Sequence, residues 1–137
     1  MGYAHADLTL FNIDDEAVVS RGLVPGLEVR KMDVRALVDT GAATLIITPN
    51  IKEQLGLRIF RKVKAALANE SEVECEEVRI GITFRNRGTV CEALVVPGAR
   101  EVLLGVIPIE AMDVIINPKK QELDLPPDRP YIAKFRI

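Results

Sequence analysis

The sequence has few of the residue types on which many enzymes depend. It contains no Trp, one His, two Ser and two Cys among its 137 residues. A catalytic Ser–His–acid triad would need the single histidine, His5, which lies in a stretch expected to be frayed. A zinc site usually takes four ligands, or three and a water, mostly from His and Cys. We therefore expect no metal site and no cofactor, and carboxylates are the reactive groups in good supply.

The charge balance and the scarcity of aromatic residues argue against nucleic-acid binding. Lys and Arg total 18 and Asp and Glu total 20, which gives a formal net charge of −2. Nucleic-acid-binding proteins usually carry a strongly basic face. Aromatic residues, which could stack on bases, make up only 4% of the chain. No nucleic-acid partner is expected.

The sequence carries no readable signal for export or membrane insertion. Its first ten residues, MGYAHADLTL, contain neither a basic segment nor an apolar one. The apolar runs at 93–97 and 102–109 are too short to span a membrane. Two cysteines without a signal peptide are expected to remain reduced thiols. These features predict a cytoplasmic protein without a membrane partner.

Length and alternation predict an all-β protein. A chain of 137 residues with 48% hydrophobic residues can build one core, so a single domain over 1–137 is expected. Apolar and charged residues alternate from 27 to 36, as in a half-buried strand. Further short strands are indicated at 45–47, 78–84, 89–96, 114–116 and 123–125. Their number and close spacing predict a closed, barrel-like domain.

One or two short helices interrupt the strands. Thr48 and Pro49 are suited to the cap and the first position of a helix, and Gly56 to the position after its end. A second short helix is expected from about Val106 to Met112.

Four local patterns complete the assignment. Alternation on both sides of 69–71 predicts a hairpin over 61–77, in which Asn69 tolerates the left-handed conformation that a turn can require. The acidic run 14–16 is expected to form a turn between strands. The alternating segment 131–137 is expected to be a last strand, either between two copies of the chain or at a local edge. Cys75 and Cys91 are expected to be packing residues rather than a redox pair.

The candidate for chemistry is Asp39, which ends an apolar strand in the run Leu37-Val38-Asp39-Thr40-Gly41-Ala42. Burial there would make the ionised carboxylate costly. Thr40 offers a hydroxyl, and Gly41 permits a tight turn with its amide near the carboxylate. Taken alone, Asp-Thr-Gly is also the composition of an ordinary turn.

The surroundings of this motif resemble the retroviral-type, or retropepsin-like, aspartic peptidase family, in its single-domain bacterial form. The family pattern hydrophobic–hydrophobic–Asp–Thr/Ser–Gly–Ala is matched by 37–42. A small helix ending in Leu-Gly-Leu is matched by 53–57, and a later apolar pair with glycine by 103–105. A helix and strand pair are matched by 108–119. The resemblance covers about 8–125 in the family's order and implies the acid-protease fold.

The resemblance implies an aspartic endopeptidase that acts on a peptide or protein substrate. Two facing carboxylates share one proton and activate a water molecule between them. The sequence has one such loop, because 113–115, 124–126 and 128–130 do not fit the pattern. The second Asp39 is therefore expected from another copy, in a two-fold homodimer. By the resemblance, Thr40 cross-links the two loops, Gly41 helps to orient the substrate and Ala42 packs under the loop.

The predicted hairpin occupies the place of the family's flap. Ala68, Asn69 and Glu70, together with Ala42, are therefore the expected substrate-binding residues. Family flaps usually carry glycine at or near the tip, where this sequence has Glu70. The hairpin is equally consistent with a sheet edge bearing solvated charges. Two alternatives to the homodimeric protease stay open: a non-catalytic dimeric β module that binds a peptide or protein partner, and one subunit of a hetero-assembly.

Overall fold

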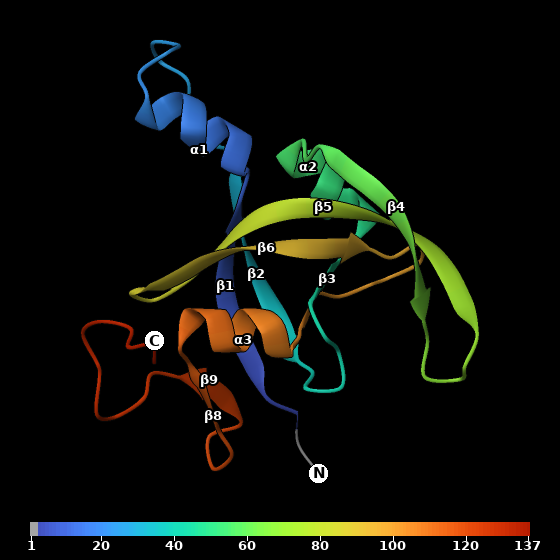
Figure 1. The fold of residues 1–137 in the computed structure, drawn as a ribbon, viewed down its shortest axis with the longest axis vertical. Coiled ribbons are helices and arrows are strands. Elements are labelled where there is room, and N and C mark those ends of the chain that lie inside the picture. Colours follow the sequence, from blue (N-terminus) through green and yellow to red (C-terminus); the bar gives the residue numbers. More distant parts are fainter. Residues whose placement is uncertain (1–2) are drawn as a thin grey trace.

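The computed structural model describes residues 3–137, within which nine strands and three helices form (Figure 1). The strands are β1 (His5–Phe11), β2 (Lys31–Val38), β3 (Leu45–Ile47), β4 (Ile59–Ala66), β5 (Glu72–Phe84), β6 (Arg87–Val95), β7 (Leu103–Leu104), β8 (Ile115–Asn117) and β9 (Glu122–Asp124). The helices are α1 (Ile13–Ser20), α2 (Pro49–Leu55) and α3 (Val106–Met112). The predicted all-β class is confirmed, with one helix more than expected. Within the described range, no helix is long and apolar enough to cross a membrane.

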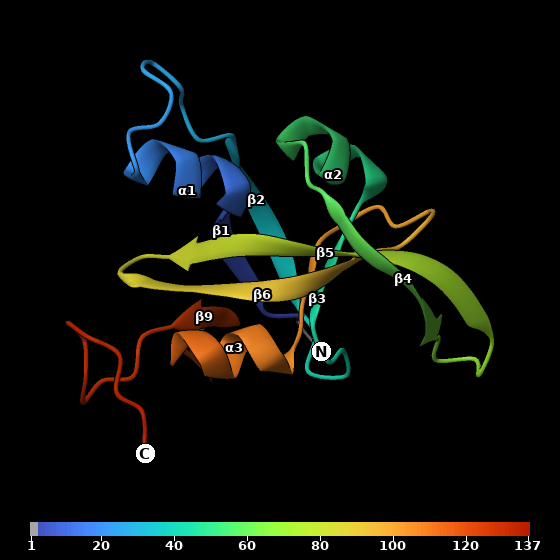
Figure 2. The ribbon, with the colours of Figure 1, turned by 45° about the horizontal axis from the view of Figure 1, so that its top comes forward.

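The strands form one sheet that closes on itself. Its order is β4-β5-β6-β3-β7-β2-β1-β9-β8, and an additional pairing joins β5 to β1. That pairing, with Leu10 opposite Ile82, closes β1, β2, β7, β3, β6 and β5 into a ring. Figures 1 and 2 show β5 and β6 crossing β1 and β2, with the β4–β5 hairpin extending beyond the ring. The hairpin is therefore a projection from a closed scaffold.

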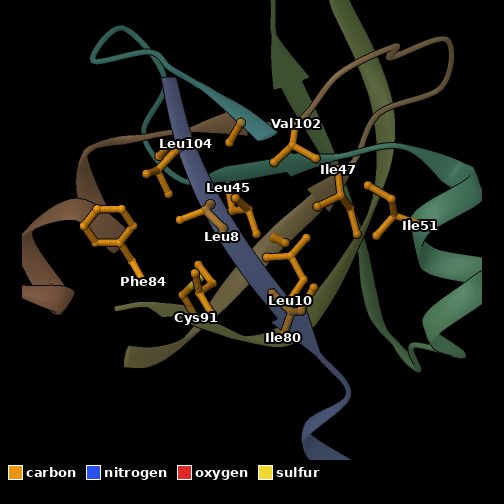
Figure 3. Close-up of a cluster of buried hydrophobic side chains, with 14 of the residues drawn as sticks. Leu8, Leu10, Leu45, Ile47, Ile51, Ile80, Phe84, Cys91, Val102 and Leu104 are labelled. Carbon is orange, nitrogen blue, oxygen red and sulfur yellow. The ribbon is translucent and has the colours of Figure 1, made fainter. Parts of the chain in front are cut away.

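The core fills the ring with side chains from alternate strand positions. Ala6, Leu8 and Leu10 of β1 are almost completely buried, as expected for one face of a strand. They pack with residues from the other strands of the ring and from α2 (Figure 3). Cys75 and Cys91 are buried and unbonded to each other, which confirms their interpretation as packing residues. Burial raises the pKa of the Cys91 thiol to about 12.

Local signals explain the predicted helix α2. The Thr48 side chain accepts a hydrogen bond from the amide of Ile51 at 3.2 Å, and Pro49 is the first helical residue. Gly56 ends the helix in the left-handed conformation, at φ 62°. The prediction from the sequence is confirmed at both ends of this helix.

The acidic run 14–16 is the first turn of α1, and its assignment as a turn between strands was wrong. The Asn12 side chain caps this helix by accepting from the amide of Asp15 at 2.9 Å. Acidic residues in a first turn are favoured by the helix dipole. The Asp15 carboxylate also accepts from the Arg30 guanidinium and from the Arg30 amide, and these hydrogen bonds lower the pKa of Asp15. The Arg30 amide is therefore bonded to a side chain, and β2 begins at Lys31 rather than at 27.

The two ends of the described chain also differ from expectation. His5 is not frayed, because it opens β1 opposite Leu37 and its amide donates to the carbonyl of Gln121 at 3.1 Å. Residues 131–137 form no strand within one copy of the chain, so the local edge strand was wrong, whereas a strand between two copies stays a prediction. Side chains, rather than a neighbouring strand, bind the backbone at this point: Asn86 donates to the carbonyls of Pro130 and Tyr131.

Asp113, which ends α3, anchors the same C-terminal segment. Its carboxylate accepts from Arg129 Nε at 2.6 Å, from Arg129 Nη2 at 2.8 Å and from the amide of Lys134 at 2.9 Å. The hydrogen bonds from Arg129 and Lys134 lower the pKa of Asp113 to about 2. Residues 131–137 are thus tied to the end of α3 while most of their side chains remain exposed.

Candidate active site

Asp39 lies where β2 leaves the sheet, and the neighbouring strand β7 fixes its position. β7 runs parallel to β2, with Leu37 opposite Leu103 and Val38 opposite Leu104. The amide of Asp39 donates to the carbonyl of Leu104 at 3.0 Å. Asp39 is half-buried. Its backbone is therefore held as part of the ring, although the side chain lies in a loop.

The loop after Asp39 is a tight turn closed by the carboxylate itself. Asp39 Oδ1 accepts a hydrogen bond from the amide of Gly41 at 2.9 Å, and the amide of Ala42 donates to the Asp39 carbonyl at 3.1 Å. A Cβ on residue 41 would lie 3.1 Å from Asp39 Oδ1, tighter than an ordinary contact. The predicted approach of the Gly41 amide to the carboxylate is confirmed. Thr40 is exposed in the same turn.

The chain segment around Gly105 supports this loop from behind. The amides of Val106 and Ile107 donate to the carbonyls of Ala42 and Ala43, at 3.0 and 2.9 Å. A Cβ at position 105 would overlap the carbonyl oxygens of Ala42 and Thr44. Glycine is therefore required here for close backbone approach, at the start of α3.

A cleft of about 740 Å³ lies in front of Asp39. Its walls come from the Asp39 loop, from the β4–β5 hairpin and from the connection between β6 and β7. The lining residues are Asp39, Gly41, Ala42, Ala43, Thr44, Ile46, Ala65, Ala66, Leu67, Ala68, Leu94, Val96, Ala99, Arg100, Glu101 and Leu103. The structure thus brings a carboxylate, a largely apolar groove and a hairpin together in one place.

Comparison with known proteins assigns this arrangement to a family. The family model described as aspartyl protease matches residues 26–107, which is more than half of the chain and includes Asp39. The chain belongs to the aspartyl protease family. A search of curated proteins finds no match.

One solved structure, the EIAV protease, agrees with this aspartyl protease assignment at the level of the fold. The EIAV protease, solved in complex with the inhibitor HBY-793, is 16% identical, with a TM-score of 0.53 and coverage of 80% of this chain and 86% of that one. A retropepsin-like aspartic protease from Rickettsia conorii is 14% identical, with a TM-score of 0.49 and coverage of 80% and 70%. The predicted acid-protease fold is confirmed.

The structure places some of the expected site residues of this aspartyl protease family member together. Asp39, Gly41, Ala42 and Ala68 all line the cleft. Thr40, Asn69 and Glu70 do not line it within a single copy of the chain. The connection between β6 and β7, which contributes Arg100 and Glu101, was missed. The only signal for it was the Pro97-Gly98 turn after a predicted strand.

The hairpin tip has an unexpected backbone. The amide of Glu70 donates to the Leu67 carbonyl at 2.9 Å, and Leu67 donates back to Ser71 at 2.8 Å. Glu70, rather than Asn69, takes the left-handed conformation, at φ 66°. Asn69 instead uses its side-chain oxygen to accept from the amide of Ser71 at 3.1 Å. The position that most favours glycine is therefore occupied by glutamate.

The two faces of the hairpin differ in polarity. In the β4–β5 register Lys64 lies opposite Glu74, whereas Ala65 lies opposite Val73 on the other face. Ala65 lines the cleft. One ion pair ties the hairpin to α2, in which Lys52 bonds to Glu76 of β5 at 2.7 Å. The hairpin therefore combines a sheet edge bearing charges with an apolar wall of the cleft.

Proposed function

We propose that the chain is an aspartic endopeptidase that hydrolyses peptide bonds as a homodimer. The observation that carries this proposal is the Asp39-Thr40-Gly41 turn at the floor of a cleft that the β4–β5 hairpin also lines. Membership of the aspartyl protease family supports it. We take residues 1–137 as one protease domain. In support of this, β1 lies before the matched range 26–107 but pairs with β2 and β5 to complete the ring.

A second copy of the chain supplies the second carboxylate. The cleft of one copy has two carboxylates, those of Asp39 and Glu101, and only Asp39 stands in an Asp-Thr-Gly turn. Two-fold symmetry places identical residues opposite each other, so two Asp39 loops can meet on the axis. Exposed apolar side chains flank this loop. Tyr3 is 70% exposed beside Ala4, whose carbonyl bonds the amide of Val38, and Ile107 is 53% exposed.

The chemistry follows from the shared proton of the pair. Two carboxyl groups in close contact do not ionise together, so one is charged and the other protonated. The charged Asp39 takes a proton from the bound water, whose oxygen attacks the peptide carbonyl carbon. The protonated Asp39 gives its proton to the carbonyl oxygen. The tetrahedral intermediate then collapses and its carbon–nitrogen bond breaks. The Asp39 that took the proton from water gives it to the leaving nitrogen, and the other Asp39 takes a proton from a hydroxyl group of the intermediate, which restores the shared proton of the pair.

Each remaining site residue has a part in this scheme. The Gly41 amide holds one oxygen of the Asp39 carboxylate, which leaves the other oxygen for water. Thr40, exposed in the turn, links the two loops across the axis. Ala42 and Ala68 contact the peptide in the cleft, while Asn69 and Glu70 approach it as the hairpin closes over it.

The substitution Asp39→Asn tests the proposal. It keeps the shape of the side chain but removes its ability to ionise, so peptide cleavage should fall by at least about 10²-fold. The measurement is the cleavage of a peptide library by purified protein from acid to neutral pH. Asp14→Asn is the matched control, because Asp14 is an exposed residue of α1 that does not line the cleft. Identical product patterns for wild type and Asp39→Asn would contradict the proposal.

A second candidate is a non-catalytic dimeric module that binds a peptide or protein in the same cleft. The charged Glu70 in a left-handed backbone at the hairpin tip favours it, because it departs from the glycine expected for a mobile flap. Under this alternative the wild type cleaves no peptide, and Asp39→Asn leaves peptide binding unchanged.

A further inference from the structure

We propose that Arg100 determines specificity by pairing with an acidic side chain of the peptide bound in the cleft. This inference rests on the proposed use of the cleft for peptides. It adds a class of substrate: a segment that carries Asp or Glu close to the bond that is cut.

The connection that carries Arg100 is fixed at both ends. Gly98 takes the left-handed conformation at φ 81°, and the amide of Ala99 donates to the Val96 carbonyl at 3.0 Å, which makes a tight turn after β6. At the other end, the carbonyl of Val102 accepts from the amide of Leu37 at 2.9 Å. Only a few residues separate these two fixed points, so Arg100 is held at the wall of the cleft.

Arg100 is the one cationic residue among those that line this otherwise mostly apolar cleft. It is exposed, and none of the ion pairs formed within residues 3–137 includes Arg100 or its neighbour Glu101. Its guanidinium is therefore available to an incoming group. The planar group matches a carboxylate in a bidentate geometry, which favours an acidic side chain over other polar ones.

The strand register limits where along the peptide this pairing falls. Val38 lies opposite Leu104 in the parallel β2–β7 pair, so Gly105 is level with Asp39. Arg100 precedes Gly105 by five residues, or at most about 17 Å of extended chain at roughly 3.3 Å per residue. A peptide bound in extended form has the same spacing. The backbone of Arg100 is therefore level with a peptide position within about five residues of the scissile bond, and the acidic residue is expected near that position.

Paired peptides provide the test. A single Glu or its uncharged match Gln is placed in turn at each position along an apolar peptide. Cleavage is measured for wild type and Arg100→Glu. At one position the wild type should prefer Glu by about threefold, as expected for an exposed ion pair, and Arg100→Glu should prefer Gln. Arg21→Glu makes the same charge change at an exposed residue after α1 and should retain the wild-type ratio. A far-ultraviolet circular dichroism spectrum that matches the wild-type spectrum shows that Arg100→Glu is folded.

Binding of the same peptides to Asp39→Asn and to Asp39→Asn/Arg100→Glu separates this inference from the proposed hydrolysis. Cleavage by the wild type without any preference for Glu would overturn the proposed role of Arg100 and would leave the proposed hydrolysis supported. The wild type could cleave no peptide while binding still favours Glu in an Arg100-dependent way. That result would support the proposed role of Arg100 and overturn the proposed hydrolysis. Absence of both binding and cleavage would overturn both.

Discussion

At the scale of single residues, the geometry of the site depends on the missing side chain of Gly105. The backbone of the Asp39 loop passes so close to this residue that a Cβ would overlap the Ala42 and Thr44 carbonyl oxygens. These oxygens belong to backbone, which cannot rotate away as a flexible side chain can. The hydrogen bonds from Val106 and Ile107 lock the same contact.

Gly105→Ala should therefore lower the free energy of unfolding by about 3 kcal/mol, at the upper end of the usual range for forced overpacking. Urea denaturation measures this loss. Gly22→Ala is the control, because a Cβ at that position meets nothing within 4 Å. Its loss of unfolding free energy comes only from placing alanine at a φ of 64° and should be about 1–2 kcal/mol. Equal losses in the two variants would contradict the steric role of Gly105.

The position of a single residue can be predicted from the sequence where the geometry of neighbouring residues determines that position. The approach of the Gly41 amide to Asp39 follows from a short turn that any Asp-x-Gly run can form. The position of Arg100 at the cleft could not be predicted in this way. It depends on where the connection between β6 and β7 crosses the ring, and this is set by pairings between distant strands.

At the scale of elements, the hairpin tip retains an unfavourable backbone at Glu70. A left-handed conformation costs a residue with a Cβ about 1–2 kcal/mol, whereas glycine adopts it freely. The carboxylate side chain is exposed and contributes nothing to the cleft lining.

Glu70→Gly should raise the free energy of unfolding by about 0.5 kcal/mol, after the greater flexibility of glycine in the unfolded chain is subtracted. Asn69→Gly is the control and should lower it, because Asn69 is outside the left-handed region and its side chain bonds the amide of Ser71. Thermal unfolding of the two variants gives the comparison. A stability loss in Glu70→Gly would show that the tip is not strained.

Helices and strands can be predicted from the sequence where they have signals at both ends. Prediction fails where tertiary contacts determine whether a segment forms a helix or a strand. Helix α2 has Thr48 before it and Gly56 after it, and both act as expected. Helix α1 has an equivalent signal in Asn12 followed by acidic residues, and the predicted turn at 14–16 overlooks it. Segment 131–137 alternates like a strand, but side chains such as Asn86 bind the adjoining backbone, so no ladder forms there within one copy of the chain.

At the scale of the whole molecule, the proposed catalytic unit is larger than one chain. Each copy brings one Asp-Thr-Gly turn, so the proposed activity requires association. The surface beside the turn has exposed apolar side chains that a second copy can cover, including Ile107 at 53% exposure.

Cleavage per chain should therefore fall on dilution, as the particle mass moves from twice 15.1 kDa toward that of a single chain. Light scattering and activity over the same concentration series measure both quantities. Ile107→Glu should shift the two curves to higher concentration by burying a charge at the interface. Leu23→Glu is the control, since Leu23 is an exposed apolar residue in the segment that follows α1. Cleavage by a species of single-chain mass would contradict the shared site.

Strand β5 has a consequence for how stability is distributed. Its 13 residues run from the tip of the hairpin into the closed ring, and they change along that path from mainly exposed to mainly buried. Opening of backbone hydrogen bonds requires least free energy where few buried contacts must be broken. The Glu72 end can therefore fluctuate through local unfolding while the Phe84 end opens only with the molecule as a whole. One continuous strand thus joins two segments that differ in local stability. Amide hydrogens should exchange fast at its Glu72 end and slowest at its Phe84 end.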